Sequence, residues 1–180
     1  FFPIFQPAGD FIIQQAGGIA GLEDVIWVGA DGILVDDFMA LPESAGMYFS
    51  GPDLRFGDNT SSTGKSYPDF LAAYEAAYGV TPPATFHAHT YDATVMLLTA
   101  IESVAVVESD GTLKIDRQAL RDALTNMSGF AGVTGTLSCD AFGDCASQTI
   151  SIIKHDDPAD IAASKANVVY SEAAGVAAAG

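Results

Sequence analysis

An apolar segment that runs into a turn containing Gly and Asp occurs twice within the first 32 residues. Residues 1–5 (Phe-Phe-Pro-Ile-Phe) precede the first turn, and Val25–Val28 precede the second, which reads Gly-Ala-Asp-Gly. A helix predicted over residues 8–15 separates the two segments, so the pattern indicates a β-α-β unit of an α/β sheet. Asp31 follows the second strand, at the carboxyl end where open α/β sheets bind their ligands. A carboxylate in that position suggests recognition of a small cationic group.

Asp31 also has an explanation that involves local structure alone. An Asp that follows a strand often accepts hydrogen bonds from the backbone of the next helix or bend. Here those elements are the short helix predicted over residues 36–41 and the bend at Gly32. The sequence leaves both explanations open.

The chain divides into segments with different patterns. Residues 1–52 are predicted to form a β-α-β-α-β unit that ends with a buried strand at Met47–Phe49. Residues 53–65 are rich in Gly, Asp, Asn, Ser and Thr without apolar periodicity, so a boundary is expected there. Three helices then follow without intervening strands: residues 66–79 with Ser66 as the N-cap, residues 86–107, and a helix capped by Asp116. The segment 53–128 is therefore predicted to be a helical layer.

Residues 129–155 have the alternation and the turn residues of a β-hairpin. Cys139 and Cys145 bracket a turn within this segment, and a disulfide between them would close the hairpin. Such a bridge indicates an oxidising, extracytoplasmic compartment, whereas in a cytosolic protein the two thiols would stay reduced. Residues 156–180 are predicted to be a weakly ordered tail, in which Val168–Tyr170 could add one short strand.

Charge excludes two classes of partner. The 180 residues include 23 acidic and 7 basic side chains, which gives a formal net charge of −16. This charge repels phosphate backbones and anionic membrane surfaces, so neither nucleic acid nor lipid headgroups are expected to bind. No apolar run approaches the roughly 18 residues that a membrane-spanning helix needs.

Three motifs that resemble ligand sites have simpler explanations. Residues 59–66 end like a phosphate-binding P-loop, but Asn59 stands where its first Gly is required and no strand precedes the loop. His87 and His89 are two residues apart, which places them on different faces of a helix instead of on one metal site. Residues 140–144 offer two carboxylates, too few for a calcium site. No nucleophile can be paired with a base, so no enzymatic activity, cofactor or metal is expected.

With these residues in place, the chain resembles the carboxyl-terminal half of type I periplasmic solute-binding proteins, in particular the branched-chain amino-acid-binding family of ABC transporters. The resemblance extends over nearly the whole chain and depends on the order and spacing of several short motifs. These motifs are residues 1–9, 27–32, 46–49, 74–79, 89–93 and 134–137, together with Asp140 and Gly143-Asp144.

The resemblance implies two α/β lobes of the Rossmann-like type that close over a small ligand. Residues 1–52 would complete lobe 2, and residues 53–128 would return to lobe 1. Residues 129–155 would cross back to lobe 2 as a hairpin, and 156–180 would form the tail. Members of the family are substantially longer, so the chain is expected to be a fragment that self-associates or retains a missing amino-terminal half.

The resemblance also implies a ligand site. An acidic residue at the position of Asp31 takes the α-ammonium group of the ligand, and an aromatic residue at the position of Phe5 packs on it. Phe86 corresponds to an aromatic residue at the border of the side-chain pocket. Gln6, which follows Phe5, and His87, the histidine expected at the edge of the cleft, complete the predicted site.

The function implied is that of an extracytoplasmic, non-enzymatic solute-binding subunit of an ABC importer. It would bind a small branched-chain amino acid or a related carboxylate in the periplasm or outside the cell, and deliver it to a permease. The alternative is a ligand-sensing domain of a receptor or regulator with the same fold, where closure generates a signal.

Overall fold

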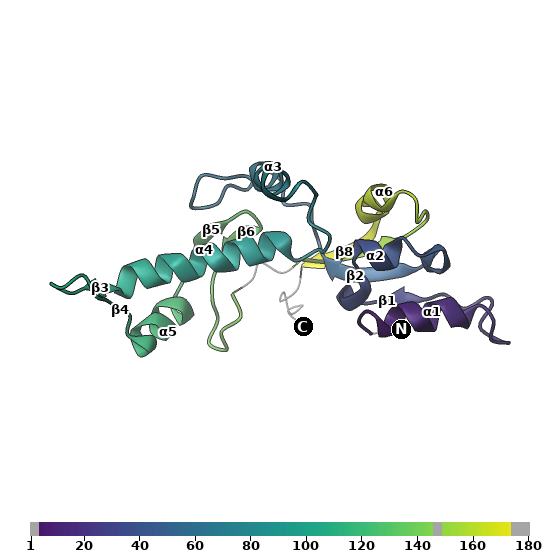
Figure 1. Cartoon of the computed structure of the whole chain (residues 1–180), viewed down its shortest axis with the longest axis horizontal. Helices are drawn as coiled ribbons and strands as arrows, with labels where there is room; N and C mark the ends of the chain where they lie inside the picture. Colours follow the sequence, from purple (N-terminus) through teal and green to yellow (C-terminus); the bar gives the residue numbers. More distant parts are fainter. Residues whose placement is uncertain (1–3, 146–148, 174–180) are drawn as a thin grey trace, which may run out of the picture. The chain divides into compact units, whose positions relative to one another are not determined.

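The computed structural model describes residues 4–145 and 149–173, which form two compact units (Figure 1). Unit 1 contains the described residues of 4–54, 82–85 and 149–173, and unit 2 contains 55–81 and 86–145. Each unit is thus assembled from segments that are distant in the sequence.

Unit 1 is built on a four-stranded sheet in the order β1-β2-β7-β8. The strands are β1 (Val28–Gly29), β2 (Tyr48–Pro52), β7 (Thr149–Lys154) and β8 (Val168–Ala173). β1 pairs with β2 in parallel, whereas β2–β7 and β7–β8 are antiparallel. The parallel pair confirms the predicted β-α-β connection between the two strands.

The predicted strands at the start of the chain need correction. The strand predicted over Val25–Val28 is only two residues long and begins at Val28, and Ile26 is 71% exposed. Of the strand predicted over residues 1–5, residues 1–3 lie outside the described part of the chain, and Ile4 and Phe5 are not in a strand. Apolar residues at these positions were mistaken for strand residues because a short apolar run carries no period of its own.

The core of unit 1 lies between this sheet and short helices. These are α1 (Ala8–Ala16), η1 (Asp31–Ile33), α2 (Asp36–Met39), η2 (Pro42–Ser44) and α6 (Ile161–Ala166). The buried cluster consists of Ile13, Ile33, Leu34, Phe38, Met39, Met47, Phe49 and Ile153. Phe38 and Phe49 meet edge to face with ring centroids 5.9 Å apart, the arrangement that aromatic quadrupoles favour.

His155 is a fully buried polar residue within this core. Its backbone continues the β2–β7 pairing, because its amide donates to Met47 O at 2.8 Å and its carbonyl accepts from Gly46 N at 2.7 Å. The ring packs edge to face on Phe49, and Nε2 lies 2.8 Å from Met39 O. Nδ1 is buried without a hydrogen-bond partner among the described residues. Burial accordingly lowers the pKa of the imidazole, against smaller opposing effects of the bond to Met39 and of nearby carboxylates.

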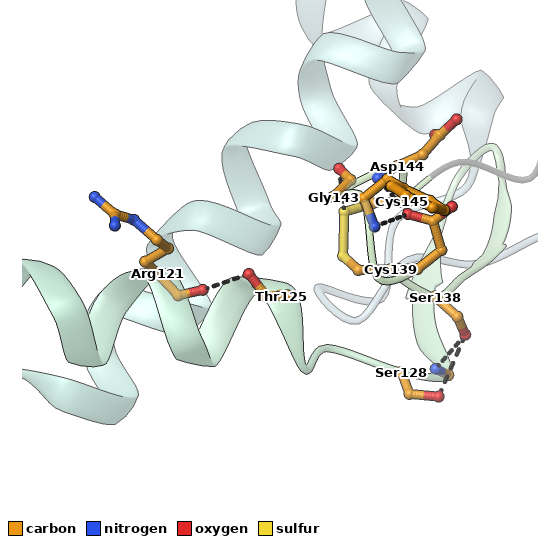
Figure 2. Close-up of a disulfide and its surroundings, with 11 residues drawn as sticks. Arg121, Thr125, Ser128, Ser138, Cys139, Gly143, Asp144 and Cys145 are labelled. Atoms are coloured by element: carbon orange, nitrogen blue, oxygen red, sulfur yellow. Dashed lines mark hydrogen bonds between the residues drawn. A yellow bond between two sulfur atoms is a disulfide. The ribbon is translucent and has the colours of Figure 1, made fainter.

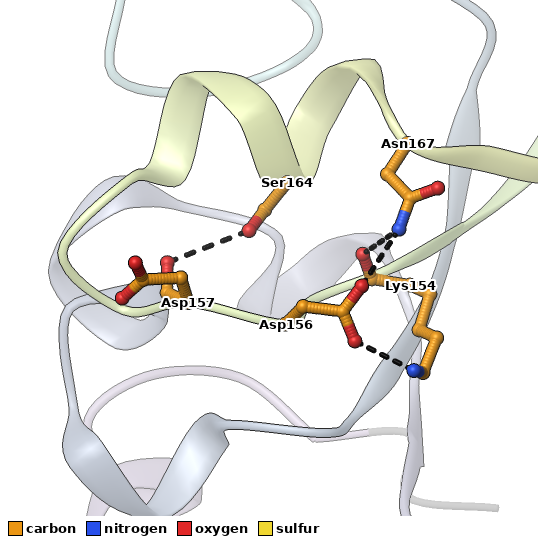
Figure 3. Close-up of polar contacts among 5 residues, drawn as sticks. All are labelled: Lys154, Asp156, Asp157, Ser164 and Asn167. Carbon is orange, nitrogen blue, oxygen red and sulfur yellow. Dashed lines mark hydrogen bonds and ion pairs between the residues drawn. The ribbon is translucent and has the colours of Figure 1, made fainter.

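The prediction of a weakly ordered tail from residue 156 is wrong for residues 161–166, which form α6. The short strand considered at Val168–Tyr170 is confirmed and continues to Ala173 as β8. Figure 3 shows the polar contacts that tie this segment to the end of β7. Asn167 Nδ2 donates to Lys154 O at 3.1 Å and to Asp156 Oδ2 at 3.0 Å, while Lys154 and Asp156 form an ion pair at 2.6 Å. Lys165 also pairs with Asp36 of α2. Of these contacts, the pair between Lys165 and Asp36 joins segments far apart in the chain, and the alanine-rich sequence of the tail does not reveal it.

Unit 2 consists of three helices and two hairpins. The helices are α3 (Tyr67–Tyr78), α4 (His87–Val104) and α5 (Arg117–Thr125), and the hairpins are β3–β4 (Val106–Val107 with Leu113–Lys114) and β5–β6 (Phe130–Gly132 with Gly135–Leu137). The predicted caps are confirmed. Ser66 forms a capping box with Asp69, and the Asp116 carboxylate accepts from Ala119 N at 2.8 Å. The helix predicted over 86–107 ends three residues early, because Val106–Val107 belong to the first hairpin.

The hairpin predicted over residues 129–155 is wrong in its pairing. β6 pairs with β5, and Thr149–Lys154 pair with β2 and β8 in unit 1. The disulfide between Cys139 and Cys145 is present, but it closes a loop that follows the β5–β6 hairpin (Figure 2). Both cysteines pack against a small core of Met96, Phe130 and Leu137.

Asp92 of α4 is almost fully buried and holds the turn of the β5–β6 hairpin. Its carboxylate accepts hydrogen bonds from Val133 N at 2.8 Å, Thr134 N at 2.9 Å and Thr134 Oγ1 at 2.6 Å. A Cβ atom at Gly132 would collide with this carboxylate, so the turn approaches the helix as closely as a glycine allows. These three donors offset the cost of burying the polar side chain of Asp92.

The first expected outcome concerns this contact. Asp92→Asn places an amide N–H against backbone donors, and we expect it to lower the free energy of unfolding by about 3 kcal/mol. Hydrogen exchange at the amides of Val133 and Thr134 should accelerate, which urea titration and exchange measurements would check. The control is Glu102→Gln, which makes the same change of charge at an exposed position of α4. Equal stabilities for the two variants would show that the contact contributes nothing.

The second expected outcome concerns pH. The unfolded chain protonates His155 near pH 6.5, whereas burial lowers the pKa of this group in the folded chain. The contribution of His155 to stability should therefore be complete above about pH 6.5 and decrease as the pH falls below that value, since the unfolded state then binds the extra proton. Urea titrations over this range should show a shallower decrease for His155→Gln. An unchanged slope in that variant would contradict the assignment.

Candidate functional site

The predicted ligand residue Asp31 lies at the edge of the sheet of unit 1. β1 ends at Gly29, and Asp31 begins the single turn η1, in which Asp31 O accepts from Leu34 N at 3.1 Å. Its side chain is exposed, and none of the described residues makes a hydrogen bond to its carboxylate. The N-cap of α2 is Val35 without a side-chain cap, so Asp31 does not cap that helix. The local explanation through α2 is excluded, and the carboxylate is left accessible.

Phe5 lies next to this turn. The ring is 70% exposed, and a Cβ atom built on Gly32 would be 2.6 Å from its Cδ1 atom and 2.7 Å from its Cε1 atom. The ring therefore occupies the space that a side chain at position 32 would need. The structure thus places the exposed Phe5 ring against Gly32, the residue that directly follows the exposed Asp31 at the end of β1.

Gln6 makes its contact within α1. Its Nε2 atom donates to both carboxylate oxygens of Asp10, at 3.2 and 3.1 Å. The contact fixes the side chain one helical turn from its own position. A role of Gln6 in ligand binding stays a prediction.

Phe86 and His87 belong to unit 2, at the start of α4. Phe86 is the N-terminal flanking residue of the helix and is 44% exposed. The His87 ring stacks on Phe70 with centroids 5.9 Å apart and planes 5° apart, and Nε2 lies 2.7 Å from Tyr67 Oη. Burial raises the pKa of the Tyr67 hydroxyl. His87 thus has a structural role in joining α3 to α4, and its place in a ligand site stays a prediction.

His89 is a residue whose environment the sequence did not reveal. Its ring lies between Phe56 and Phe86, each at a centroid distance of 5.8 Å, and Nδ1 is buried without a hydrogen-bond partner in the described part of the chain. Desolvation lowers the pKa of this imidazole, and the neighbouring His87 lowers it further, whereas Asp92 opposes the shift. A neutral His89 supports the orientation of Phe86. The aromatic residues on both sides of the helix start were a signal for this packing.

The motifs that resemble other sites are occupied by internal contacts. In the loop that resembles a P-loop, the amides of Ser61, Ser62 and Gly64 donate to the carbonyls of Lys65, Ala131 and Ser61 at 2.7–2.8 Å, so they do not point together at a bound phosphate. Between residues 4 and 145 and between 149 and 173, no three His, Cys, Asp or Glu side chains are arranged to hold a metal ion. Over the same residues, no helix has both the length and the apolar character needed to cross a bilayer.

Comparison with known proteins gives matches to both sequence and structure. A family model described as "Periplasmic binding protein" matches residues 11–157. A leucine binding protein from Thermotoga maritima matches with a TM-score of 0.63 and 21% identity, over 87% of this chain and 41% of that protein. A branched-chain amino acid transporter substrate binding protein from Streptococcus pneumoniae, in complex with isoleucine, matches with a TM-score of 0.62 and 24% identity. This match covers 95% of this chain and 42% of that protein.

A more distant structure extends the range of bound molecules. A solute binding protein of an ABC transporter from Rhodopseudomonas palustris, in complex with 3,4-dihydroxybenzoic acid, matches with a TM-score of 0.53 and 23% identity, over 86% and 39% of the two chains. None of the curated protein sequences shows a significant match. The chain spans about two fifths of the length of these solved structures, and at such identities the likeness concerns the mixed α/β fold alone.

The contact between Phe5 and Gly32 leads to the third expected outcome. Gly32→Ala would force the Phe5 ring out of its position, and we expect a loss of about 1–2 kcal/mol of stability from this overpacking. Amide hydrogen exchange in α1 should accelerate as well, because Gly9 N of this helix donates to Phe5 O. Thermal unfolding and hydrogen exchange of α1 would measure both.

The matched control is Gly17→Ala. A Cβ atom at Gly17 meets nothing within 4 Å, and the residue has φ −63°, which alanine adopts without strain. This variant should be neutral or slightly more stable. Two variants of equal stability would contradict the close packing of Phe5 on Gly32.

Proposed function

The chain belongs to the periplasmic binding protein family, and on this premise we propose that it forms part of the solute-binding subunit of an ABC importer. The family predicted from the sequence is confirmed, and it is a family of binding proteins and not of enzymes. The proposed ligand is a small amino acid of the branched-chain type or a related carboxylate, held between two lobes.

The packing of Phe5 against Gly32, the residue next to Asp31, is the observation that supports this proposal most. The Asp31 carboxylate has no hydrogen bond from a described residue and would accept from an ammonium group, a charge-assisted bond that is stronger than a neutral one. The exposed Phe5 ring offers an apolar surface for an aliphatic side chain. An α-amino acid carries its ammonium group and its side chain on the same carbon atom, Cα.

The ligands of the proteins with a similar fold differ, and the negative charge of Asp31 helps to choose between them. One is a leucine binding protein and another was crystallised with isoleucine, whereas a third holds 3,4-dihydroxybenzoic acid. An aromatic acid has no cationic group, so Asp31 would repel its carboxylate if the two came close. Asp31 therefore favours the amino acid over the aromatic acid.

We assign unit 1 to lobe 2 and unit 2 to lobe 1 of the type I fold. In this assignment Asp31, Phe5 and Gln6 act from lobe 2, and Phe86 and His87 act from lobe 1. The ligand would be released to a permease, from a binding protein located in the periplasm or outside the cell. The remaining three fifths of the family's length would supply the groups that bind the ligand carboxylate.

The fourth expected outcome tests the role of Asp31. In the protein that carries this sequence, calorimetric titration with leucine, isoleucine and valine should detect binding, and Asp31→Asn should weaken it by roughly 10- to 100-fold, the loss of one charge-assisted hydrogen bond. Asp37→Asn, an exposed carboxylate in α2, is the matched control and should bind as the wild type does.

Two results would count against the proposal. If 3,4-dihydroxybenzoic acid binds and no amino acid does, the amino-acid assignment is wrong. If Asp31→Asn and Asp37→Asn bind the same amino acid equally well, Asp31 does not contact the ammonium group.

A further inference from the structure

The loop closed by the disulfide, residues 139–145, is held by its own contacts and is here called the Cys loop. Cys139 and Cys145 are bonded through their sulfur atoms, and their Cα atoms are 3.8 Å apart (Figure 2). Asp140 N donates to Asp144 O at 2.8 Å, and Gly143 N donates to Asp140 O at 3.1 Å. Gly143 has φ +88°, a conformation that closes the turn and that glycine adopts without strain.

The Asp140 side chain fixes the tip of the loop. Its Oδ1 atom accepts hydrogen bonds from Phe142 N at 2.8 Å and from Asp144 N at 2.9 Å. These backbone donors lower the pKa of the carboxyl, so Asp140 keeps its negative charge. The polar backbone of the tip is thus satisfied inside the loop, and the loop needs no covering element to hold its shape.

Phe142 stands at this tip and is 96% exposed, more than any other large apolar residue for which the structure gives an exposure. Leaving a phenyl ring in water forgoes the favourable free energy of burying it. Because the cross-link and the hydrogen bonds already fix the backbone, a partner that buries this ring loses little conformational entropy on binding. A rigid loop with an exposed aromatic tip has the properties of an interface anchor.

We propose that the Cys loop is a docking element whose Phe142 ring enters an apolar pocket, rimmed by Lys or Arg side chains, on a protein partner. The basic rim is inferred from charge complementarity: Asp140 and Asp144 lie two residues before and after Phe142 in the loop, and the whole chain has a net charge of −16. The same charges disfavour an anionic lipid surface and a second copy of this chain. In the choice of probe, the proposal depends on the proposed function, because the permease of an importer is the protein that its binding subunit must meet.

The probe is the permease and ATPase complex of the importer proposed above, purified in lipid nanodiscs, with empty nanodiscs of the same lipid alongside. We expect the protein to bind the complex and Phe142→Ser to weaken that binding at least tenfold, the loss of one anchor residue. Phe11→Ser, which removes another exposed ring from α1, should bind within twofold of the wild type. Phe142→Tyr should retain most of the affinity.

A further variant distinguishes the contribution of the Phe142 ring to binding from the contribution of the loop's rigidity. Cys139→Ser with Cys145→Ser keeps Phe142 but removes the cross-link, and it should bind less tightly than the wild type. Equal binding of Phe142→Ser and the wild type to the complex, or binding of the wild type to empty nanodiscs as strongly as to the complex, would overturn the proposal. So would a wild-type protein that binds neither.

Calorimetry with amino acids on the same preparations keeps the two proposals apart. One outcome is that Phe142→Ser binds an amino acid as the wild type does and yet no longer binds the permease and ATPase complex. That result supports the docking role independently of the ligand site. If no amino acid binds while Phe142→Ser still weakens binding to the complex, only the proposed ligand is wrong.

Discussion

The backbone pairing of β2 with β7 is the interaction on which the architecture depends. It joins residues about a hundred positions apart, from Tyr48 opposite Lys154 to Pro52 opposite Ile150, and Asp53 N extends it by donating to Thr149 O at 2.9 Å. All of unit 2 is contained in the intervening chain. Such a long closure costs conformational entropy, which the apolar contacts around Phe49 and Ile153 offset. β1, whose end carries Asp31, pairs with the other edge of the same β2 strand.

Unit 2 is held together differently from unit 1, since it has no large sheet of its own among the described residues. Its helices are joined by polar and aromatic contacts: Asp92 holds the β5–β6 turn on α4, and Tyr67 and Phe70 hold α3 on the first turn of α4 through His87. These contacts fix the start of α4, where Phe86 is exposed. A candidate ligand residue is therefore positioned by neighbours that need not touch a ligand themselves.

Local features could be predicted from the sequence and non-local ones could not. The caps at Ser66 and Asp116 involve residues three positions apart, so the local sequence is sufficient to predict them. The partner of Thr149–Lys154 was assigned wrongly, because every strand pattern fits many partners and the true one lies far away in the chain. In the candidate site, the position of Asp31 after a strand could be seen in advance. The packing of Phe5 on Gly32 could not, since a missing side chain leaves no pattern.

That packing has a consequence for how the protein can vary. Because the phenyl ring at position 5 fills the volume left by the missing side chain at position 32, the two positions are sterically coupled and substitutions at them will not be additive. A bulkier residue at 32 becomes compatible only with a smaller one at 5. Across homologous sequences the pair should covary in size, and each compensated exchange would reshape the wall beside Asp31 while leaving its charge in place.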